Sequence, residues 1–501
     1  MKDLKIVNAK FPDFENDTWR TADILIHDGK IQKIGTAEEE CARVIDASGK
    51  VVSPGFIDIH AHEDEFSGNK EDDFFTAGRG LLMGVTTQIV GNCGDMYNSM
   101  EELAKRIDEE GAPVNFMTFI GQNYLREQAG ADDRYKASTK AQLEKMKTLL
   151  YQTKKYFPVG LSCGFEYAPG VTTEETIELA KALDDEGYLI SVHFREDGPK
   201  AVDSTRELVE ISKATGYGIE MSHIGSCSAV GYMDDTLKVI DEARLKGVDI
   251  STDCYPYNAF CTGIGTAVFD EGCFERWGKS YSDILVLDGP YVNRRCDKEL
   301  FEKLRREDPD LHVAVFAMNQ EEVDKAFATP YVMVGSDCGF VNRHGHPRGA
   351  GAFPKVIREY VREKKILTLM DALKKMTVLT ADRVNLDEKG EIKEGRDADI
   401  VIFDENTIAD GATFENPTMK PVGIDYVIVG GKIAADHGVI KDDSCGRSSI
   451  RTADISIKSR TNAGSLRCGL TEKVSAKSSA ETFLYLSIIL EHTYSFHLAG
   501  R

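Results

Sequence analysis

The feature that most constrains the fold is a long alternation of strand-like and helix-like segments between residues 56 and 385. Short apolar runs that end in Gly, Asp or Asn are followed by stretches with the apolar period of an amphipathic helix, as in residues 172–187 and 234–247. Such repeated units are typical of a parallel sheet, because parallel strands need a long crossover connection. About eight of them predict a closed (β/α)8 barrel, an α/β fold.

Both ends of the chain have a different pattern. Residues 1–54 and 386–443 contain short apolar or alternating runs between turn residues, which predicts β-strands. We therefore expect a small β-sandwich formed by both chain ends, beside a barrel over residues 55–385. Residues 263–334 are too long for one strand–helix unit, so this range predicts an inserted lid region over the barrel mouth.

The composition changes at Ser444. Residues 444–501 are rich in serine and carry a net charge of +4, against −26 for the rest of the chain. Their one apolar run, residues 483–490, is long enough for a helix but too short for a membrane span. We predict that this tail is mostly disordered and lies outside the functional unit.

Charge and cysteine usage limit the possible partners and the compartment. The formal net charge of −22 makes nucleic acid and anionic membranes poor partners. The 11 cysteines are odd in number and follow no spacing framework, which fits free thiols in a reducing cytoplasm. The N-terminus lacks the apolar core of a signal peptide, and no stretch approaches the ~18 apolar residues of a membrane helix. We expect a cytoplasmic protein that acts on a small molecule.

Polar residues that suit a metal stand where the predicted barrel strands end. Active sites of such barrels form at these strand ends, so the side chains should converge. Imidazole, thiolate and carboxylate together suit zinc. One histidine at a strand end is more often structural, and neighbouring histidines can simply be solvated, but a set at successive ends predicts a metal site. The set is His60, His62, Cys93, His193, His223 and Asp337. The other histidines fall outside this pattern: His27, His312, His344, His346, His437, His492 and His497.

Several motifs carry a resemblance to a known family. Residues 54–62, "PGFIDIHAH", resemble the first-strand signature of the amidohydrolase superfamily. Within it, the chain is similar to the N-acyl-D-amino-acid deacylases, or D-aminoacylases, over about residues 3–440, in order; the tail does not match. The resemblance implies a metal-bearing (β/α)8 barrel flanked by a small β-sandwich. The segments that carry it are "GVTTQIVGNCG", "GLSCGFEYAPG", "SVHFRED", "MSHIG", "DCYPY", "GSDCG", "GHPRGAGAFP" and residues 375–404.

The resemblance also implies roles for the matching metal-site residues. Cys93 takes the place that a carboxylated lysine holds in many relatives, and with His193 and His223 it should hold one tight zinc ion. His60 and His62 would form a second, weaker metal position. Asp337 matches the catalytic aspartate after the eighth strand, placed to accept a proton from water and later return it to the leaving amine.

Substrate contacts follow from the same resemblance. Arg348 and Tyr255 match groups that bind the substrate α-carboxylate, whereas Cys261 stands where many members have serine, which weakens one carboxylate contact. Members that act on D-glutamate derivatives carry a lysine shortly after the histidine that matches His223; here Ile224, Gly225 and Ser226 follow, so an acidic substrate side chain is less expected. Two further residues are expected to line the site, Glu166 and Tyr167.

The expected function is zinc-dependent hydrolysis of the amide bond of N-acyl-D-amino acids, releasing a D-amino acid and a carboxylate. Two alternatives stay open. One is another amidohydrolase, acting on a cyclic amide of the hydantoin or dihydropyrimidine type or on a dipeptide; Cys93 and the Tyr255–Arg348 pair argue against it. The other is a metal-binding homologue without turnover, against which the complete ligand set and Asp337 argue.

Overall fold

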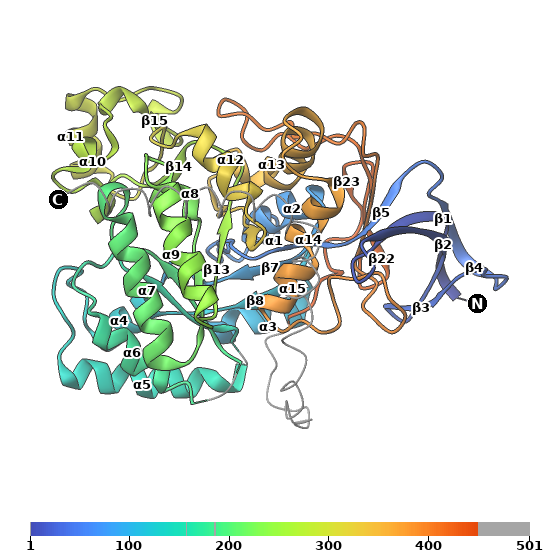
Figure 1. Cartoon of the computed structure of the whole chain (residues 1–501), viewed down its shortest axis with the longest axis horizontal. Coiled ribbons are helices and arrows are strands. Elements are labelled where there is room, and N and C mark those ends of the chain that lie inside the picture. Colours follow the sequence, from blue (N-terminus) through green and yellow to red (C-terminus); the bar gives the residue numbers. More distant parts are fainter. Residues whose placement is uncertain (1, 157, 185–186, 449–501) are drawn as a thin grey trace, which may run out of the picture. The chain divides into compact units, whose positions relative to one another are not determined.

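Parallel strands form the centre of the molecule. The structure is a computed structural model that describes residues 2–156, 158–184 and 187–448 (Figure 1). Each strand is short, and nearly all of its residues, apolar and polar, are buried, as expected where helices cover a parallel sheet. In order around the sheet, the strands are β6 (Phe56–Asp58), β7 (Val85–Val90), β8 (Asn115–Thr118), β10 (Gly160–Gly164), β11 (Leu189–His193), β12 (Gly218–Met221), β13 (Ile250–Cys254) and β17 (Val332–Val334).

Backbone hydrogen bonds close these strands into a barrel. β6, β7 and β8 form a three-stranded sheet. A six-stranded sheet is formed by β9 (Ile120–Gly121), β10, β11, β12, β13 and β17, and only Phe119 separates β8 from β9. Beyond β17 the chain meets β6 again: Asp337 N–H donates to the His60 carbonyl over 2.7 Å, and His62 N–H donates to the Cys338 carbonyl over 2.9 Å. The predicted (β/α)8 barrel is therefore confirmed.

At least one helix follows each barrel strand. Three of these helices begin at capping boxes, in which the side chains of Ser99, Thr139 and Thr368 accept from backbone N–H groups three residues later. The main helices are α2 (Phe75–Leu82), α3 (Met100–Glu110), α4 (Gln122–Ala129), α5 (Lys140–Thr153), α6 (Thr173–Lys181), α7 (Ala201–Thr215), α9 (Met233–Leu245), α12 (Gln320–Ala328), α13 (Arg348–Lys355) and α14 (Leu369–Met376).

A second, nine-stranded sheet is built from both ends of the described chain. The two ends meet where β5 (Val51–Pro54) pairs antiparallel with β20 (Ile400–Phe403). Its inner side chains, among them Ile6, Ile26 and Ile400, form a core of their own. The other strands are β1 (Lys2–Asp13), β2 (Thr18–His27), β3 (Lys30–Ile34), β4 (Cys41–Asp46), β21 (Ile424–Val429), β22 (Lys432–Asp436) and β23 (Val439–Ile440).

Phe56 joins the barrel to this second sheet. It is fully buried at the start of the first barrel strand. Its ring stacks on Phe353 of α13, with centroids 5.7 Å apart, and lies 6.3 Å from Phe403 of β20. One aromatic cluster therefore ties the strand that leads to His60 to a barrel helix and to the outer sheet.

The insertion is narrower than the predicted range 263–334. It contains a three-stranded antiparallel sheet of β14 (Phe260–Gly263), β15 (Ile284–Val286) and β16 (His312–Val315), with the helices α10 (Cys273–Trp277) and α11 (Lys298–Glu307). The end of the predicted range is wrong, because α12 and β17 belong to the barrel. We call residues 260–315 the inserted subdomain.

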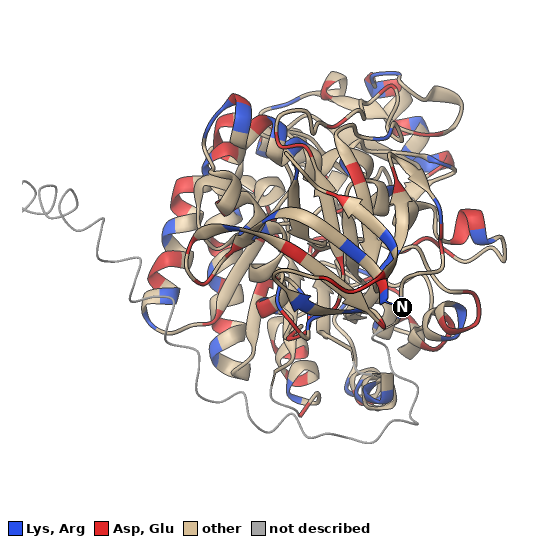
Figure 2. Cartoon of the chain, turned by 90° about the vertical axis from the view of Figure 1, so that its right-hand side faces the viewer, with Lys and Arg blue, Asp and Glu red and all other residues tan. Residues whose placement is uncertain are grey.

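The predicted tail is described only at its start. Gly446 N–H donates to the Ala112 carbonyl over 2.8 Å, and Phe116 N–H donates to the Arg447 carbonyl over 3.0 Å, so residues 444–448 lie against the start of β8. Residues 449–501 lie outside the described residues. Among the described helices, none has the length and apolar character needed to cross a membrane. Acidic and basic residues intermingle along the helices and strands seen in Figure 2.

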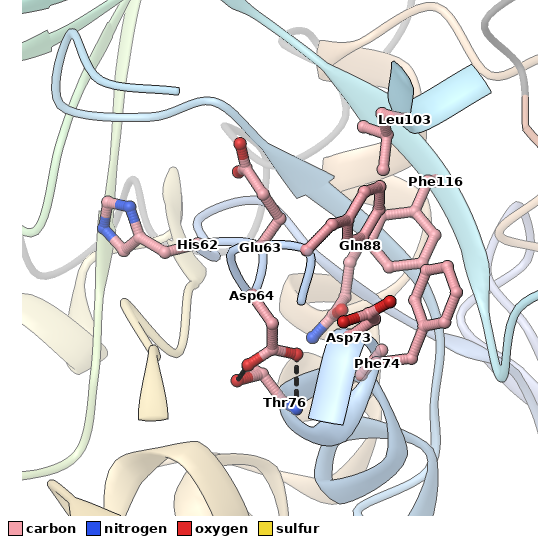
Figure 3. Close-up of a pocket in the computed structure, with 11 residues that line it drawn as sticks. His62, Glu63, Asp64, Asp73, Phe74, Thr76, Gln88, Leu103 and Phe116 are labelled. Atoms are coloured by element: carbon pink, nitrogen blue, oxygen red, sulfur yellow. Dashed lines mark hydrogen bonds between the residues drawn. The ribbon is translucent and has the colours of Figure 1, made fainter. Parts of the chain in front are cut away.

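Acidic side chains fix the loop after β6. Glu63 accepts from the backbone N–H groups of Gly91 and Tyr97, over 3.3 and 3.0 Å. Asp64 accepts from the Thr76 backbone and hydroxyl, over 2.8 and 2.6 Å, in a small pocket that His62 also lines (Figure 3). These carboxylates thus anchor the loop that carries His62 to its neighbours.

Candidate metal centre

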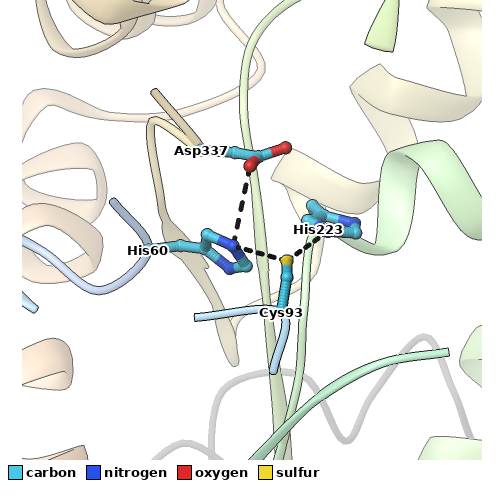
Figure 4. A group of neighbouring side chains, drawn as sticks. All are labelled: His60, Cys93, His223 and Asp337. Carbon is cyan, nitrogen blue, oxygen red and sulfur yellow. Dashed lines mark hydrogen bonds and ion pairs between the residues drawn. The ribbon is translucent and has the colours of Figure 1, made fainter. Parts of the chain in front are cut away.

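Four buried side chains converge at the C-terminal ends of the barrel strands. The potential ligand atoms of His60, Cys93, His223 and Asp337 all lie within 4.8 Å of one another (Figure 4). Cys93 Sγ is 3.3 Å from His60 Nε2 and 3.6 Å from His223 Nε2, and His60 Nε2 is 3.6 Å from Asp337 Oδ1. Two nitrogens, one sulfur and one oxygen are a donor set that zinc accepts.

The other two predicted ligands flank this group. His193 Nδ1 lies 3.1 Å from His223 Nε2, and His62 Nε2 lies 3.2 Å from Asp337 Oδ1. All six predicted residues therefore form one connected cluster. The most compact group, however, contains His60 and Asp337 rather than His193, so the division into a tight and a weak metal position stays a prediction.

Three of these residues have unusual backbone conformations. Cys93, His223 and Asp337 have positive φ angles of 57°, 34° and 49°. Residues other than glycine adopt this left-handed region at an energetic cost, and such strain concentrates at functional sites. For Cys93 the turn is made possible by Gly94, which has φ 84° and lies so close to the Gly164 backbone that a Cβ there would approach its nitrogen to 2.7 Å.

Three of the four imidazoles in the cluster are held by a partner on their other nitrogen. Ser226 Oγ lies 2.7 Å from His223 Nδ1, Asp253 Oδ2 lies 3.2 Å from His60 Nδ1, and Glu166 Oε2 lies 3.0 Å from His193 Nε2. Partners of this kind fix the tautomer and the ring orientation of histidines that bind metals. The nitrogens that face the group are then free to act as ligands.

Sequence reasoning missed two of these partners. Asp253 lies on the buried strand β13 and also accepts the His223 backbone N–H over 2.9 Å. Ser226 entered the prediction only as one of the three residues that follow His223, in a region where some relatives carry a lysine. The one available signal was the position of Asp253 near the end of a barrel strand. Glu166, which was expected to line the site, does so.

Burial sets the protonation states of the group. It lowers the pKa of His60 to about 3 and that of His193 to about 4, and it lowers the pKa of His223 well below its usual value. These imidazoles are therefore neutral at neutral pH and offer lone pairs. Burial also raises the pKa of the Cys93 thiol well above its usual value, so binding of a metal ion here releases the Cys93 proton.

Arg348 faces Asp337 from the start of α13. Its Nη1 lies 2.9 Å from Asp337 Oδ2, and its guanidinium stacks 4.5 Å from the centre of the buried Tyr255 ring. Burial favours a raised pKa for Asp337, but Arg348 and the nearby imidazoles outweigh it and bring that pKa well below the usual value. Among the described residues, Arg348 Nε has no hydrogen-bond partner, so one edge of the buried guanidinium is available to an anion.

Relatives identify the family. A model described as "Amidohydrolase family" matches residues 310–435. A D-aminoacylase from Alcaligenes xylosoxydans xylosoxydans is 30% identical over 90% of this chain and 98% of its own, and an N-acyl-D-glutamate deacylase from the same organism is 30% identical over 82% and 89%. The chain belongs to the N-acyl-D-amino-acid deacylase family. The crystal structure of N-acyl-D-glutamate deacylase from Bordetella bronchiseptica, with zinc and a phosphonate inhibitor, matches with a TM-score of 0.80 and 29% identity over 90% of this chain and 100% of its own.

In the present deacylase a small, partly open cavity adjoins the metal centre. Cys261 lies in its wall, and burial raises the pKa of that thiol to about 11, so it stays protonated. His344 is exposed and away from the cluster, whereas His346 is buried and accepts the Arg348 backbone N–H over 3.1 Å. The wall also contains Glu166, Tyr167, His193, Phe194, Asp197, His223, Ser226, Phe260, Thr262, Val268 and Asp337.

Proposed function

We propose that this protein is a zinc-dependent deacylase that hydrolyses the amide bond of N-acyl-D-amino acids, releasing a D-amino acid and a carboxylate. The observation that carries the proposal is the buried group of His60, Cys93, His223 and Asp337, with Arg348 paired to the carboxylate. The D-amino-acid stereochemistry is supported by the relatives alone.

The metal-site residues divide into two positions in this proposal. Cys93, His193 and His223 hold a tight zinc ion, and His60 and His62 provide a second, weaker position. Zinc, when bound, is a Lewis acid that makes water nucleophilic at neutral pH. Asp337, ionised because its pKa is low, accepts the proton of the attacking water and passes it to the leaving amine.

The substrate carboxylate binds to Arg348, whose planar guanidinium suits a two-pronged contact. Tyr255 supports that guanidinium from below through its ring. Cys261 contributes a weak thiol contact where a serine hydroxyl would bind more strongly. Because Arg348 contacts both Asp337 and the substrate carboxylate, the proton acceptor lies next to the bound substrate.

The substrate side chain is not anionic in this proposal. Glu166 and Asp197 both line the cavity, and no lysine follows His223. Arg276, the cation that faces this pair, is already engaged by both carboxylates, so a second carboxylate on the substrate would lack a cation of its own. This distinguishes the chain from its relative that acts on D-glutamate derivatives.

A paired assay tests the proposal. Purified, zinc-loaded protein is incubated with N-acetyl-D- and N-acetyl-L-amino acids that carry neutral and acidic side chains, and the released amine is read by chiral chromatography. Release from neutral D substrates alone is the expected result. If the zinc-bound protein releases no amine from any of these substrates, the proposal is rejected in favour of a cyclic-amide or dipeptide hydrolase. If it also fails to hydrolyse cyclic amides and dipeptides, it is a homologue without turnover.

We further propose a cytoplasmic location, without nucleic acid or membrane partners. The ten described cysteines are all free thiols, which suits a reducing compartment. The strongly negative net charge disfavours binding to phosphate backbones and anionic lipids. Fractionation of the cells that make this protein, followed by immunodetection, tests the location.

A further inference from the structure

A half-buried arginine from the inserted subdomain reaches two carboxylates on the barrel. Arg276 lies on α10, its Nη2 is 3.3 Å from Glu166 Oε1, and its Nε forms an ion pair with Asp197. Glu166 and Asp197 follow the neighbouring strands β10 and β11 and are 7% and 2% exposed. The adjacent Trp277 adds a 2.5 Å hydrogen bond from its indole N–H to Asp197.

This contact continues into the metal centre. The second oxygen of Glu166, Oε2, lies 3.0 Å from His193 Nε2, and His193 Nδ1 lies 3.1 Å from His223 Nε2. A line of direct contacts thus leads from the inserted subdomain through Arg276, Glu166 and His193 to the ligand group.

We propose that Arg276 is a positioning residue that couples docking of the inserted subdomain to the orientation of His193. The inference rests on the proposed metal centre and goes beyond it, because it assigns a role to a residue that contacts neither metal nor substrate. Docking of α10 fixes Glu166, and Glu166 fixes the imidazole. The metal centre is then fully assembled only while the inserted subdomain covers the barrel mouth.

The charges explain why an arginine is needed. Glu166 and Asp197 are two buried carboxylates with few other donors, and a buried charge that loses its partner is strongly unfavourable. The guanidinium is planar and presents separate N–H groups, so it can bind both carboxylates at once, whereas a lysine ammonium would favour one. Without Arg276, Glu166 is free to turn away from His193 towards water.

Zinc binding by variants tests this role without any substrate. Arg276→Ala should weaken zinc binding by up to about 10- to 100-fold in chelator competition, the usual range for losing the partner of a metal ligand, because it releases Glu166 from His193. It should also change the visible spectrum of the cobalt-substituted protein, since His193 is no longer held in place. Arg276→Lys should restore part of the affinity. The matched control is Arg305→Ala, which removes a similarly half-buried arginine that pairs with Asp270 inside the inserted subdomain.

Reciprocity supplies an independent readout. If docking favours zinc, zinc must favour docking to the same extent. Zinc should therefore slow amide hydrogen exchange in α10 of the wild type and of Arg305→Ala, and much less so in Arg276→Ala. In a Glu166→Gln background, Arg276→Ala should have a smaller effect on zinc affinity than it has alone.

Two results would overturn the inference: equal zinc affinity in Arg276→Ala and Arg305→Ala, or additive effects of Arg276→Ala and Glu166→Gln. If Arg276→Ala does not fold, Arg276→Lys provides the test by itself. Zinc affinity equal to that of the wild type in Arg276→Lys would show that binding both carboxylates at once is not required, and would reject the proposed role of Arg276. Failure of the metal centre itself would be separate and visible, since the wild type would then bind no zinc.

Discussion

Replacing Asp337 by asparagine separates the proposed proton transfer from metal binding. The amide has nearly the same shape as the carboxylate, so it can turn its oxygen towards Arg348 Nη1, 2.9 Å away, and its amino group towards His62 Nε2, 3.2 Å away. It cannot accept a proton from water. Loss of a general base typically costs ~10²- to 10⁴-fold in rate, or ~2.7–5.5 kcal/mol of barrier.

The assay measures kcat, KM and bound zinc for Asp337→Asn. We expect kcat to fall by two to four orders of magnitude while zinc content stays at the wild-type level, because Cys93, His193 and His223 are unchanged. A control is Asp64→Asn, which alters a half-buried carboxylate that holds the loop at Thr76 and lies outside the ligand group. Near-normal kcat with zinc retained would refute the role of Asp337, and loss of zinc would make it a necessary ligand instead.

Three further predictions test the binding of substrate, the joint between the layers and a buried amine. Arg348→Lys removes a two-pronged contact worth ~1.5–3 kcal/mol, so KM should rise ~10- to 100-fold; steady-state kinetics would contradict this if only kcat fell. Phe56→Ala should lower the free energy of unfolding by ~3–5 kcal/mol in denaturant titration, and a loss below 1 kcal/mol, roughly that of a surface change, would mean that the aromatic cluster does not join barrel and sheet. Burial lowers the pKa of Lys375 to about 7, so between this value and the ~10.4 of an unfolded lysine the unfolded chain binds the extra proton and stability rises with pH. Lys375→Met lacks this dependence on pH, so its free energy of unfolding relative to wild type should fall by up to ~1.4 kcal/mol for each unit that the pH rises across this window. Parallel plots of unfolding free energy against pH for the two proteins would contradict this prediction.

The barrel and its polar strand ends could be predicted because both depend on local patterns. A short apolar run that ends in His or Asp identifies a strand and the residue at its C-terminal end, and barrel topology then brings these strand ends together. The end of the insertion was placed too late because α12, which belongs to the barrel, follows the insertion directly and resembles its helices. Length alone could not show where the barrel resumes.

The supporting residues could not be predicted in the same way. Whether Asp253, Ser226 or Glu166 holds an imidazole depends on which ring nitrogen faces the ligand group, and that is a property of side-chain orientation in three dimensions. Arg276 is still less visible, because its two carboxylate partners lie 110 and 79 positions away in the sequence. Nothing in the local sequence around Arg276 distinguishes it from a surface arginine.

The backbone at the ligand group argues that the site is functional rather than a by-product of folding. Cys93, His223 and Asp337 each occupy the left-handed region, at a typical cost of ~1–3 kcal/mol apiece. Hydrogen bonds that the barrel itself supplies hold two of them there: Asp253 accepts the His223 N–H, and the Asp337 N–H donates to the His60 carbonyl. A chain selected only for stability would relax such positions or place glycine in them. Their persistence, with side chains directed at one point, is what a site that binds and activates a ligand requires.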